Sequence, residues 1–398
     1  MYKRAVTATI GEFRPPARLL LGPGPSEVHP RVLRAMSAPL LGHLDPAFLA
    51  MMEDVKAMLR STFGTRNDLT IPISGTGSAG MEACLVNLLE PGDAFVVGVN
   101  GVFGTRMAEV AERAGARVVR VEAPWGQIVR PEQIEAALRN CPRPKLVALV
   151  HAETSTGAWQ PLGDAAKLAH HHGALFLADC VTSLAGVPVD VDAVGIDAAY
   201  SGTQKCLSCP PGLSPITFGP RAVEVVTTRK TKVQSWYLDL SLLAKYWGEE
   251  RVYHHTAPIT MNYALREALR LVEEEGLAAR HQRHALHHRA LAAGLEAMGL
   301  SLAAQAGHRL PMLNAVSVPE GIAEDGVRGY LLARHGIEIG AGLGPMKGKV
   351  WRIGLMGESC KQSSVLLVLS ALEDALREQG RAVPPGAGLA AAAGVYAQ

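Results

Sequence analysis

The stretch SGTQKCLSCPPG, residues 201–212, places one lysine, Lys205, among small and polar residues directly after the apolar run GIDAAY. A lysine considered alone is normally found at the surface with its ammonium group in water. At the end of a predicted strand, however, a lysine can lose its proton and act as a nucleophile toward an aldehyde. The rest of the chain decides between these two interpretations.

An acid follows another predicted strand. ALFLAD, residues 174–179, reads as a buried strand that finishes on Asp179. A carboxylate there is costly unless a cation or a donor faces it, although taken alone it could also cap the next turn. An amine and an acid that meet in one crevice suit pyridoxal 5'-phosphate, because the lysine binds the aldehyde and the acid pairs with the ring nitrogen.

From about residue 70 to 200, apolar runs of five to seven residues alternate with helical patterns. This alternation predicts right-handed crossovers and an α/β fold with a mostly parallel sheet. In such sheets ligands bind at the carboxyl ends of the strands. Lys205 and Asp179 both follow strands, so we expect them to share that edge.

The length of 398 residues indicates two domains. We expect an N-terminal arm over residues 1–20, a large cofactor-binding domain over 21–275 and a smaller α+β domain over 276–398. Gly276 interrupts a long helical pattern and marks the boundary. The Ala/Gly/Pro-rich C-terminal tail is expected to be loosely held.

SGTGSAGMEA, residues 74–83, combines a strand end, a glycine-rich turn and a helix start. Free backbone N–H groups and the helix dipole favour an anion there, and Thr76 and Ser78 add hydroxyls. The same residues match a dinucleotide fingerprint, which would make the protein a nicotinamide-dependent dehydrogenase. That match is weak, because the following strand ends on Asn100 instead of an acid.

Three further residues suit a cofactor and an amino-acid substrate. NGVFG, residues 100–104, puts Phe103 in a loop where it could stack on a ring, and HAETSTG, residues 151–157, offers Ser155 toward the ring oxygen. Arg352 lies in an apolar strand, and its guanidinium fork matches a carboxylate. Alone, Phe103 would more often be a core residue and Arg352 half of a salt bridge.

Composition narrows the partners and the compartment. The net charge is only +2, and no basic stripe indicates a nucleic-acid partner. Hydrophobic residues make up 48% of the chain, but no apolar run approaches the ~18 residues of a membrane span. Six scattered cysteines fit reduced thiols in a cytoplasmic protein, with Cys206 and Cys209 packed instead of metal-binding. The histidines of residues 281–288 are expected to lie on a solvated helix face, so we expect no metal site.

Taken together, these motifs resemble class V aminotransferases, and more narrowly alanine–glyoxylate (serine–pyruvate) aminotransferases. The resemblance runs from LLLGPGPS, residues 19–26, to about residue 380 and includes YHHTAP, residues 253–258. Glutamine before the lysine distinguishes the chain from cysteine desulfurases, which carry histidine there. The resemblance implies the fold type I (aspartate aminotransferase-like) architecture of pyridoxal phosphate-dependent transferases.

The resemblance also implies roles for particular residues. Lys205 would carry the cofactor, Asp179 and Ser155 would contact its ring, and Arg352 would bind the substrate carboxylate, with Gly24 shaping a tight pocket. A homodimer is implied, in which Tyr253 and Thr256 reach the phosphate of the neighbouring subunit. The residues implied at the phosphate within the same chain are Thr76, Gly77, Ser78 and Gln204.

The expected activity is a ping-pong transamination from alanine or serine to glyoxylate or pyruvate. Lys205 would act as the general base and Asp179 would keep the ring nitrogen protonated. Three alternatives stay open: a related aminotransferase that uses pyridoxamine or 2-aminoethylphosphonate, a non-catalytic ligand sensor built on the same body, and the dehydrogenase.

Overall fold

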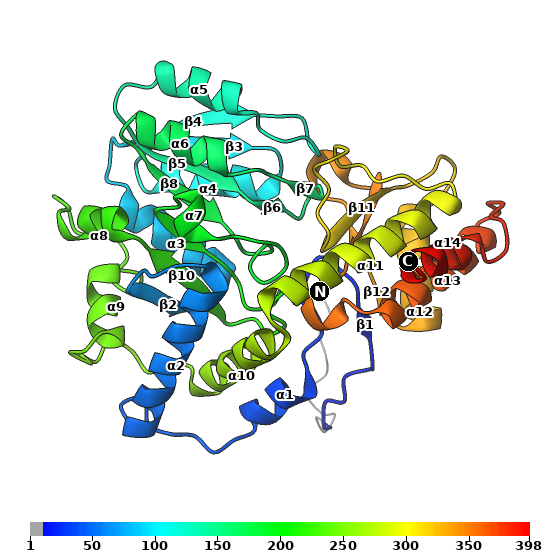
Figure 1. The fold of residues 1–398 in the computed structure, drawn as a ribbon, viewed down its shortest axis with the longest axis horizontal. Helices are drawn as coiled ribbons and strands as arrows, with labels where there is room; N and C mark the ends of the chain where they lie inside the picture. Colours follow the sequence, from blue (N-terminus) through cyan, green and yellow to red (C-terminus); the bar gives the residue numbers. More distant parts are fainter. Residues whose placement is uncertain (1–10) are drawn as a thin grey trace, which may run out of the picture.

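A computed structural model describes residues 11–398, which form a larger and a smaller lobe (Figure 1). Half of the predicted arm, residues 1–10, lies outside the described residues. Residues 11–18 form no helix or strand, and the first strand is β1 (Leu19–Leu20). The large lobe contains the main sheet, and the C-terminal helices gather in the small lobe (Figure 1).

The large lobe is built on a seven-stranded sheet in which only β10 runs against its neighbours. The other strands run in one direction, which confirms the predicted mostly parallel α/β sheet. In spatial order the strands are β2 (Leu69–Ser74), β10 (Leu213–Phe218), β9 (Ala198–Tyr200), β8 (Leu175–Asp179), β5 (Pro144–Val150), β3 (Ala94–Val99) and β4 (Arg117–Glu122).

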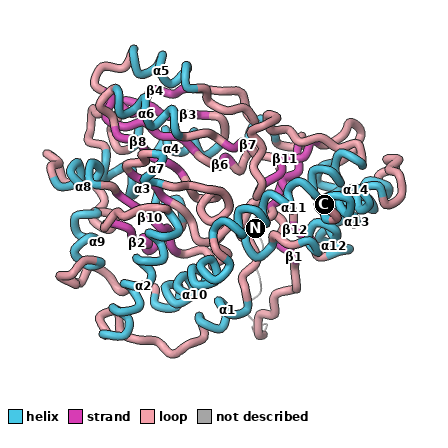
Figure 2. The backbone as a smooth tube through the Cα atoms, in the orientation of Figure 1, coloured by secondary structure: helices cyan, strands magenta, loops and turns pink. Residues whose placement is uncertain are grey.

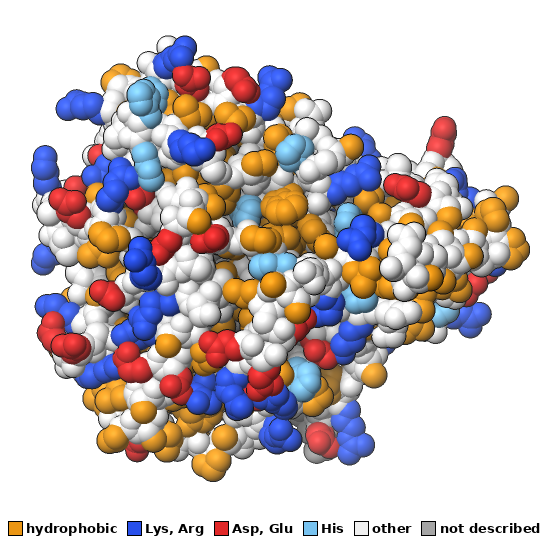
Figure 3. Space-filling view, viewed as in Figure 1, with side chains coloured by type: hydrophobic (Ala, Val, Ile, Leu, Met, Phe, Trp, Pro, Cys, Tyr) orange, Lys and Arg blue, Asp and Glu red, His pale blue; other side chains and the backbone are white. Residues whose placement is uncertain are grey.

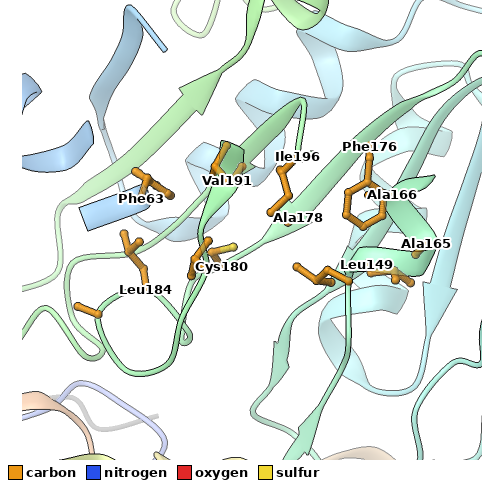
Figure 4. Packing of buried hydrophobic residues seen from close by; sticks show 14 of the residues in the cluster. Phe63, Leu149, Ala165, Ala166, Phe176, Ala178, Cys180, Leu184, Val191 and Ile196 are labelled. Carbon is orange, nitrogen blue, oxygen red and sulfur yellow. The ribbon is translucent and has the colours of Figure 1, made fainter. Parts of the chain in front are cut away.

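Helices cover both faces of this sheet, so its central strands are continuous apolar runs. Successive residues of β3 point to opposite faces of the sheet and pack into two hydrophobic clusters. Phe95 belongs to the first cluster and Val96 to the second. Figure 4 shows part of the second cluster around Phe176 and Leu149. The large-lobe helices are α1 (Pro30–Met36), α2 (Pro46–Phe63), α3 (Gly77–Leu88), α4 (Val102–Arg113), α5 (Pro131–Arg139), α6 (Gly163–His171), α7 (Val191–Val194), α8 (Pro220–Thr227), α9 (Leu240–Trp247) and α10 (Ile259–Glu275).

The small lobe packs helices against a three-stranded antiparallel sheet of order β11–β14–β13. Its elements are α11 (Leu277–Ala297), β11 (Leu313–Ser317), α12 (Glu324–His335), β12 (Ile337–Glu338), β13 (Gly340–Ala341), the 3-10 turn η1 (Gly344–Met346), β14 (Val350–Gly354), the 3-10 turn η2 (Gly357–Ser359), α13 (Gln362–Glu378) and α14 (Ala387–Tyr396). A separate hairpin, β6 (Ala152–Glu153) with β7 (Ala158–Trp159), follows β5.

The chain passes between the lobes more than once. Gly276, with φ +81, separates α10 from α11 at the predicted position, and the tube in Figure 2 turns there. The beginning of the described chain, however, packs with the small lobe: β1 pairs with β12, and Leu21 is buried in the same core as Trp351. The division at residue 21 therefore remains a prediction that this packing does not favour.

The C-terminal tail differs from the expectation of a loosely held segment. Residues 387–396 form helix α14, which packs on α11 and buries Ala392. The hydroxyl of Tyr396 contacts Nδ1 of His287 at 2.9 Å. The small side chains that suggested low complexity instead permit a close approach of two helices: a Cβ on Gly294 of α11 would lie 2.9 Å from the carbonyl oxygen of Gly388 of α14.

The histidines of residues 281–288 are not a solvated face, because this part of α11 lies between the two lobes. His284 is fully buried; its Nδ1 lies 2.8 Å from the carbonyl oxygen of Arg280, and its Nε2 accepts the N–H of Gly357 at 3.0 Å. Among residues 11–398, no cluster of three or more side chains could hold a metal ion.

Acidic and basic side chains are intermingled on the face shown in Figure 3. None of the helices in residues 11–398 is long and apolar enough to span a bilayer.

Candidate active site

A cavity of ≈ 210 Å³ lies at the carboxyl edge of the main sheet. Parallel strands direct their carboxyl ends to this edge, so segments that are distant in sequence meet there. The cavity is lined by Thr76, Gly77, Ser78, Met81, Phe103, Arg106, Val150, Ala152, Thr154, Asp179, Val181, Thr182, Gln204 and Lys205.

Lys205 lies in the turn that follows β9, and only 9% of its surface is exposed. Its Nζ donates to the carbonyl oxygen of Pro23. Gly24 leaves room for the amine, since a Cβ at this residue would lie 2.5 Å from Nζ. Burial, and then the charge of Arg352, lower the pKa of Lys205 to about 8. The amine can therefore be neutral near physiological pH.

Asp179 is the last residue of β8 and is buried. Its Oδ1 accepts the N–H of Val181 at 2.9 Å, and its Oδ2 accepts the hydroxyl hydrogen of Tyr200 at 2.7 Å. Burial raises the pKa of Asp179 to about 6, while these two bonds and the charge of Lys205 act in the opposite direction. The carboxylate is thus oriented and ready to pair with a positively charged ring nitrogen.

The predicted anion site forms where β2 leads into α3. Thr76 is the N-cap residue of α3, and its side chain makes no capping bond, so the first N–H groups are open to a ligand. At Gly77 a Cβ would lie 3.2 Å from Val181, so a larger residue would narrow the cavity. Ser78 also lines the cavity.

Gln204 provides an independent indication of a ligand. Its Oε1 is buried and has no hydrogen-bond partner within residues 11–398, although the side chain lines the cavity. Buried amides are normally paired, and either end of an amide can face a ligand. This orphaned group, the open α3 N–H groups and the Lys205–Asp179 pair fit pyridoxal phosphate.

Phe103 lines the cavity from the first turn of α4 instead of the predicted loop. The guanidinium of Arg106 lies 5.0 Å from the centre of its ring, and Nη1 of Arg106 donates to Oγ of Ser78 at 3.3 Å. Arg106 was not expected at the site. Its signal, a basic residue one helical turn after the aromatic residue, is too common to be diagnostic.

The structure places Thr154, in place of Ser155, on the cavity wall. Ser155 is fully buried; its hydroxyl donates to Oε1 of Glu153 at 2.5 Å and accepts the N–H of Val102 at 3.0 Å. Its hydrogen is thereby directed away from the cavity. The sequence prediction chose Ser155 for the ring oxygen, and it singled out neither Thr154 nor Glu153.

Arg352 lies in β14 of the small lobe and is 7% exposed. Its Nε donates to the carbonyl oxygen of Ala341 at 2.6 Å, and its Nη1 to that of Thr154 at 3.2 Å. Because a guanidinium has five N–H groups, three remain for a substrate carboxylate. Burial lowers the pKa of Arg352, but a guanidinium stays charged at physiological pH, so Arg352 can still bind a carboxylate.

Tyr253 and Thr256 do not line the cavity of their own chain, and both are exposed. The ring of Tyr253 lies 5.1 Å from that of His43, and the nearby His255 contacts Oγ of Ser74 at 2.7 Å. Since Ser74 directly precedes the turn at Thr76, this segment is located beside the cavity but not in it.

This fold and this cavity define a pyridoxal phosphate-dependent enzyme of fold type I. The family of class-V aminotransferases matches residues 19–356. The chain belongs to this family, and it is a pyridoxal phosphate-dependent transaminase. It is therefore neither the ligand sensor nor the dehydrogenase that the sequence left open.

Three relatives illustrate this membership. The (S)-ureidoglycine–glyoxylate transaminase of Bacillus subtilis is 44% identical over 97% of each chain. A crystal structure of that Bacillus enzyme has a TM-score of 0.96 over 98% of this chain and 100% of its own. The alanine–glyoxylate aminotransferase of Nostoc sp. is 51% identical, with a TM-score of 0.91 over 93% and 98% of the two chains. The pyridoxamine–pyruvate aminotransferase of Mesorhizobium loti is 29% identical, with a TM-score of 0.91 over 95% and 97%.

Proposed function

We propose that the enzyme transfers an amino group from a small amino acid, alanine or serine, to glyoxylate or pyruvate by a ping-pong mechanism. The observation that carries this proposal is the placement of the Lys205 amine. It lies in one cavity with Asp179, donates to the carbonyl oxygen of Pro23 and packs closely against Gly24. Backbone packed this closely on the reacting amine favours a donor with a small side chain.

Bound pyridoxal phosphate supplies an electron-accepting ring that stabilises negative charge at the substrate α-carbon. Lys205 would hold the cofactor aldehyde through Nζ, and the free amine of Lys205 would serve as the general base that takes the substrate α-proton. Its lowered pKa keeps a fraction of the amine unprotonated for this step. The same Nζ would hold that proton and could return it, so one group would act as base and as acid.

Asp179 would keep the ring nitrogen of the bound cofactor protonated. Each of its oxygens already accepts one hydrogen bond from the protein, so the carboxylate is held in place and retains lone pairs for the ring N–H. Thr154 would bond to the ring oxygen and Phe103 would lie against the ring. Thr76, Gly77 and Ser78 would hold the phosphate, and Gln204 would reach it with the NH2 end of its amide, since the amide oxygen can only accept.

Arg352 would bind the carboxylate that donor and acceptor share. Its Nε and Nη1 are fixed by backbone carbonyls of both lobes, which leaves the other donors at a defined place. A fixed fork selects planar carboxylates and orients the substrate α-carbon toward Lys205.

The active form would be a homodimer in which Tyr253 and Thr256 reach the phosphate of the neighbouring subunit. An exposed apolar surface around Tyr253 supports this proposal; it consists of Leu40, Leu44, Trp236, Val252 and Tyr253. Trp236 stacks on His254 with 4.4 Å between ring centres, so Trp236 lies beside the segment that contains Val252 and Tyr253. Contiguous exposed apolar residues are typical of protein interfaces.

Subunit complementation tests the dimer. Lys205→Ala and Tyr253→Ala chains should each be nearly inactive alone, but mixed dimers would contain one site with both residues intact. Unfolding and refolding the two variants together should restore about a quarter of the wild-type activity. Failure to restore activity, with mixed dimers present by mass, would place Tyr253 in its own subunit's site or outside any site.

(S)-Ureidoglycine is a second candidate donor. The Bacillus relative named for it matches 97% of this chain, and its structure has a TM-score of 0.96. Glyoxylate is the acceptor in the names of both the Bacillus and the Nostoc relatives. We therefore propose glyoxylate as the principal acceptor under either donor.

A donor-by-acceptor matrix on the purified holoenzyme separates these candidates. Alanine, serine, (S)-ureidoglycine, pyridoxamine and 2-aminoethylphosphonate would each be paired with glyoxylate and with pyruvate. The proposal predicts the highest kcat/KM for alanine or serine with glyoxylate. A hundred-fold preference for another donor would replace the substrate assignment without changing the reaction class.

We also propose a cytoplasmic location. All six cysteines are buried and none is in a disulfide, which suits a reducing compartment. Cell fractionation tests this proposal, and recovery of the protein with a secreted or organelle fraction would overturn it.

A further inference from the structure

Glu153 is a buried acid that the reaction described above does not use. It ends β6 and has no exposed surface. The hydrogen bonds to its carboxylate come from uncharged donors, which are the N–H and O–H of Ser155 and the N–H of Phe103. Burial raises the pKa of Glu153 to about 7, and the nearby Asp179 adds to this effect. An acid retained in such a place requires a reason.

The reason lies at the beginning of α4. The first N–H groups of a helix have no partner within the helix and need an external acceptor. Gly101 is the N-cap residue and has no side chain to supply one. Oε2 of Glu153 accepts the N–H of Phe103 at 3.1 Å, and Oγ of Ser155 accepts that of Val102 at 3.0 Å. The last residue of β6 and the loop that follows it therefore cap α4 from outside.

Gly101 is the residue that makes this arrangement possible. A Cβ there would lie 2.4 Å from Cδ of Glu153 and 2.5 Å from Oγ of Ser155. A serine, threonine or aspartate, which usually caps a helix, would expel the acid. The carboxylate of Glu153 also lies at the N-terminus of α4, where the helix dipole favours a negative charge.

Two residues that face the cavity are held by this cap. Phe103 donates its backbone N–H to Glu153, and Thr154 lies between Glu153 and Ser155, which bond to each other at 2.5 and 3.1 Å. The carbonyl oxygen of Thr154 also accepts Nη1 of Arg352. A displacement of Glu153 would therefore shift the aromatic face, the ring-oxygen hydroxyl and the carboxylate clamp together.

We propose that Glu153 is a positioning residue for the cofactor: by capping α4 from the neighbouring loop, it fixes Phe103 and Thr154 against the ring of pyridoxal phosphate. The proposal rests on the cofactor contacts proposed above for these two residues. It does not depend on which amino donor the enzyme uses.

The test compares Glu153→Ala and Glu153→Gln with Glu373→Ala. Alanine removes every acceptor. Glutamine keeps the volume but has one acceptor oxygen, so at least one backbone N–H stays unpaired. Glu373 is the matched control, because it is a buried glutamate that accepts the N–H of Gly386 at the start of α14, in the small lobe.

Three quantities are measured for each variant: the Kd for pyridoxal phosphate, the visible circular dichroism of the bound cofactor, and the Tm. Loss of a buried hydrogen-bonded acceptor predicts at least a ten-fold higher Kd for Glu153→Ala, a smaller increase for Glu153→Gln, and altered dichroism for both. Glu373→Ala should lower the Tm and leave the Kd and the dichroism unchanged.

A wild-type Kd and dichroism in both Glu153 variants, with only the Tm lowered, would reduce Glu153 to a structural residue and overturn the proposal. If alanine prevents folding, the glutamine variant decides the matter alone. Failure of the wild-type chain to bind pyridoxal phosphate would instead overturn the cofactor assignment itself, so the two failures are distinguishable.

Discussion

The hydroxyl of Tyr200 donates to Oδ2 of Asp179 at 2.7 Å, and the two residues are also partners in the register of β9 and β8. The bond joins a fully buried phenol to a buried carboxyl at the carboxyl edge of the sheet. A bond to the charged form stabilises it, so Tyr200 would set the pH range in which Asp179 can play its proposed role at the ring nitrogen.

The first prediction concerns this bond. Tyr200→Phe removes the donor, and since the Tyr200 hydroxyl lowers the pKa of Asp179, the variant should raise that pKa. The acid limb of the kcat/KM profile should move to higher pH by about one unit. Tyr246→Phe is the control, because that hydroxyl contacts the backbone of His43 instead. Superimposable profiles for Tyr200→Phe and wild type would contradict the prediction.

The second prediction concerns stability. The pKa of Asp179 in the folded apoprotein, about 6, exceeds its ordinary value of 3.8. The favourable contribution of Asp179 to the free energy of unfolding is therefore complete below about pH 4 and is lost as the pH rises through 6. Asp179→Asn avoids this loss, so the apoprotein variant should gain up to about 3 kcal/mol in the free energy of unfolding at pH 7.5 while losing activity.

Urea unfolding at pH 3.5 and pH 7.5 measures this difference. The gain should be small at the lower pH, where Asp179 is protonated in the folded chain and mostly protonated in the unfolded chain. An equal effect at both pH values would show that the substitution acts through packing or hydrogen bonds instead of charge.

The third prediction uses Gly24. Its φ of +104 disfavours any side chain, and a new Cβ would lie 2.5 Å from Nζ of Lys205. Gly24→Ala should therefore displace the amine and lower kcat by at least ten-fold in a chain that still folds. Gly42→Ala, with no atom within 4 Å of the new Cβ, should have wild-type kcat. Equal kcat values for the two variants would show that the Pro23–Gly24 segment does not constrain Lys205.

The fourth prediction concerns Arg352. Because donor and acceptor share a carboxylate, Arg352→Lys should raise KM for both and lower kcat/KM by about 100-fold, with a smaller change in kcat. Lysine retains the charge but not the fork. An unchanged KM for either substrate would assign the carboxylate contact to another residue, for which Arg106 on the cavity wall would be the first choice.

The sequence predicted those site residues whose positions follow from strand order. Lys205, Asp179 and the turn at Thr76 each follow a strand whose carboxyl end lies on one edge, and the structure brings them to one cavity. The sequence pointed to Ser155 instead of Thr154, because adjacent residues point in opposite directions and the outcome depends on Glu153, which bonds both to Ser155 and to Phe103, 50 residues away in the sequence.

The other differences have a tertiary cause as well. The alanines of α14 and the histidines of α11 are weak signals by themselves, and each acquires its place only by contact with the other helix or with η2. Tyr253 was assigned to a neighbouring subunit by family resemblance alone, since nothing in its local sequence distinguishes a cross-subunit contact from an exposed loop.

The most direct test of the central claim is chemical. Borohydride reduction of the holoenzyme makes the link between cofactor and lysine permanent, and peptide mapping by mass spectrometry then locates it. The account predicts that the peptide containing Lys205 carries the reduced cofactor and that the Lys205→Ala chain carries none. Labelling of another lysine, or of no lysine in a fully active enzyme, would contradict it.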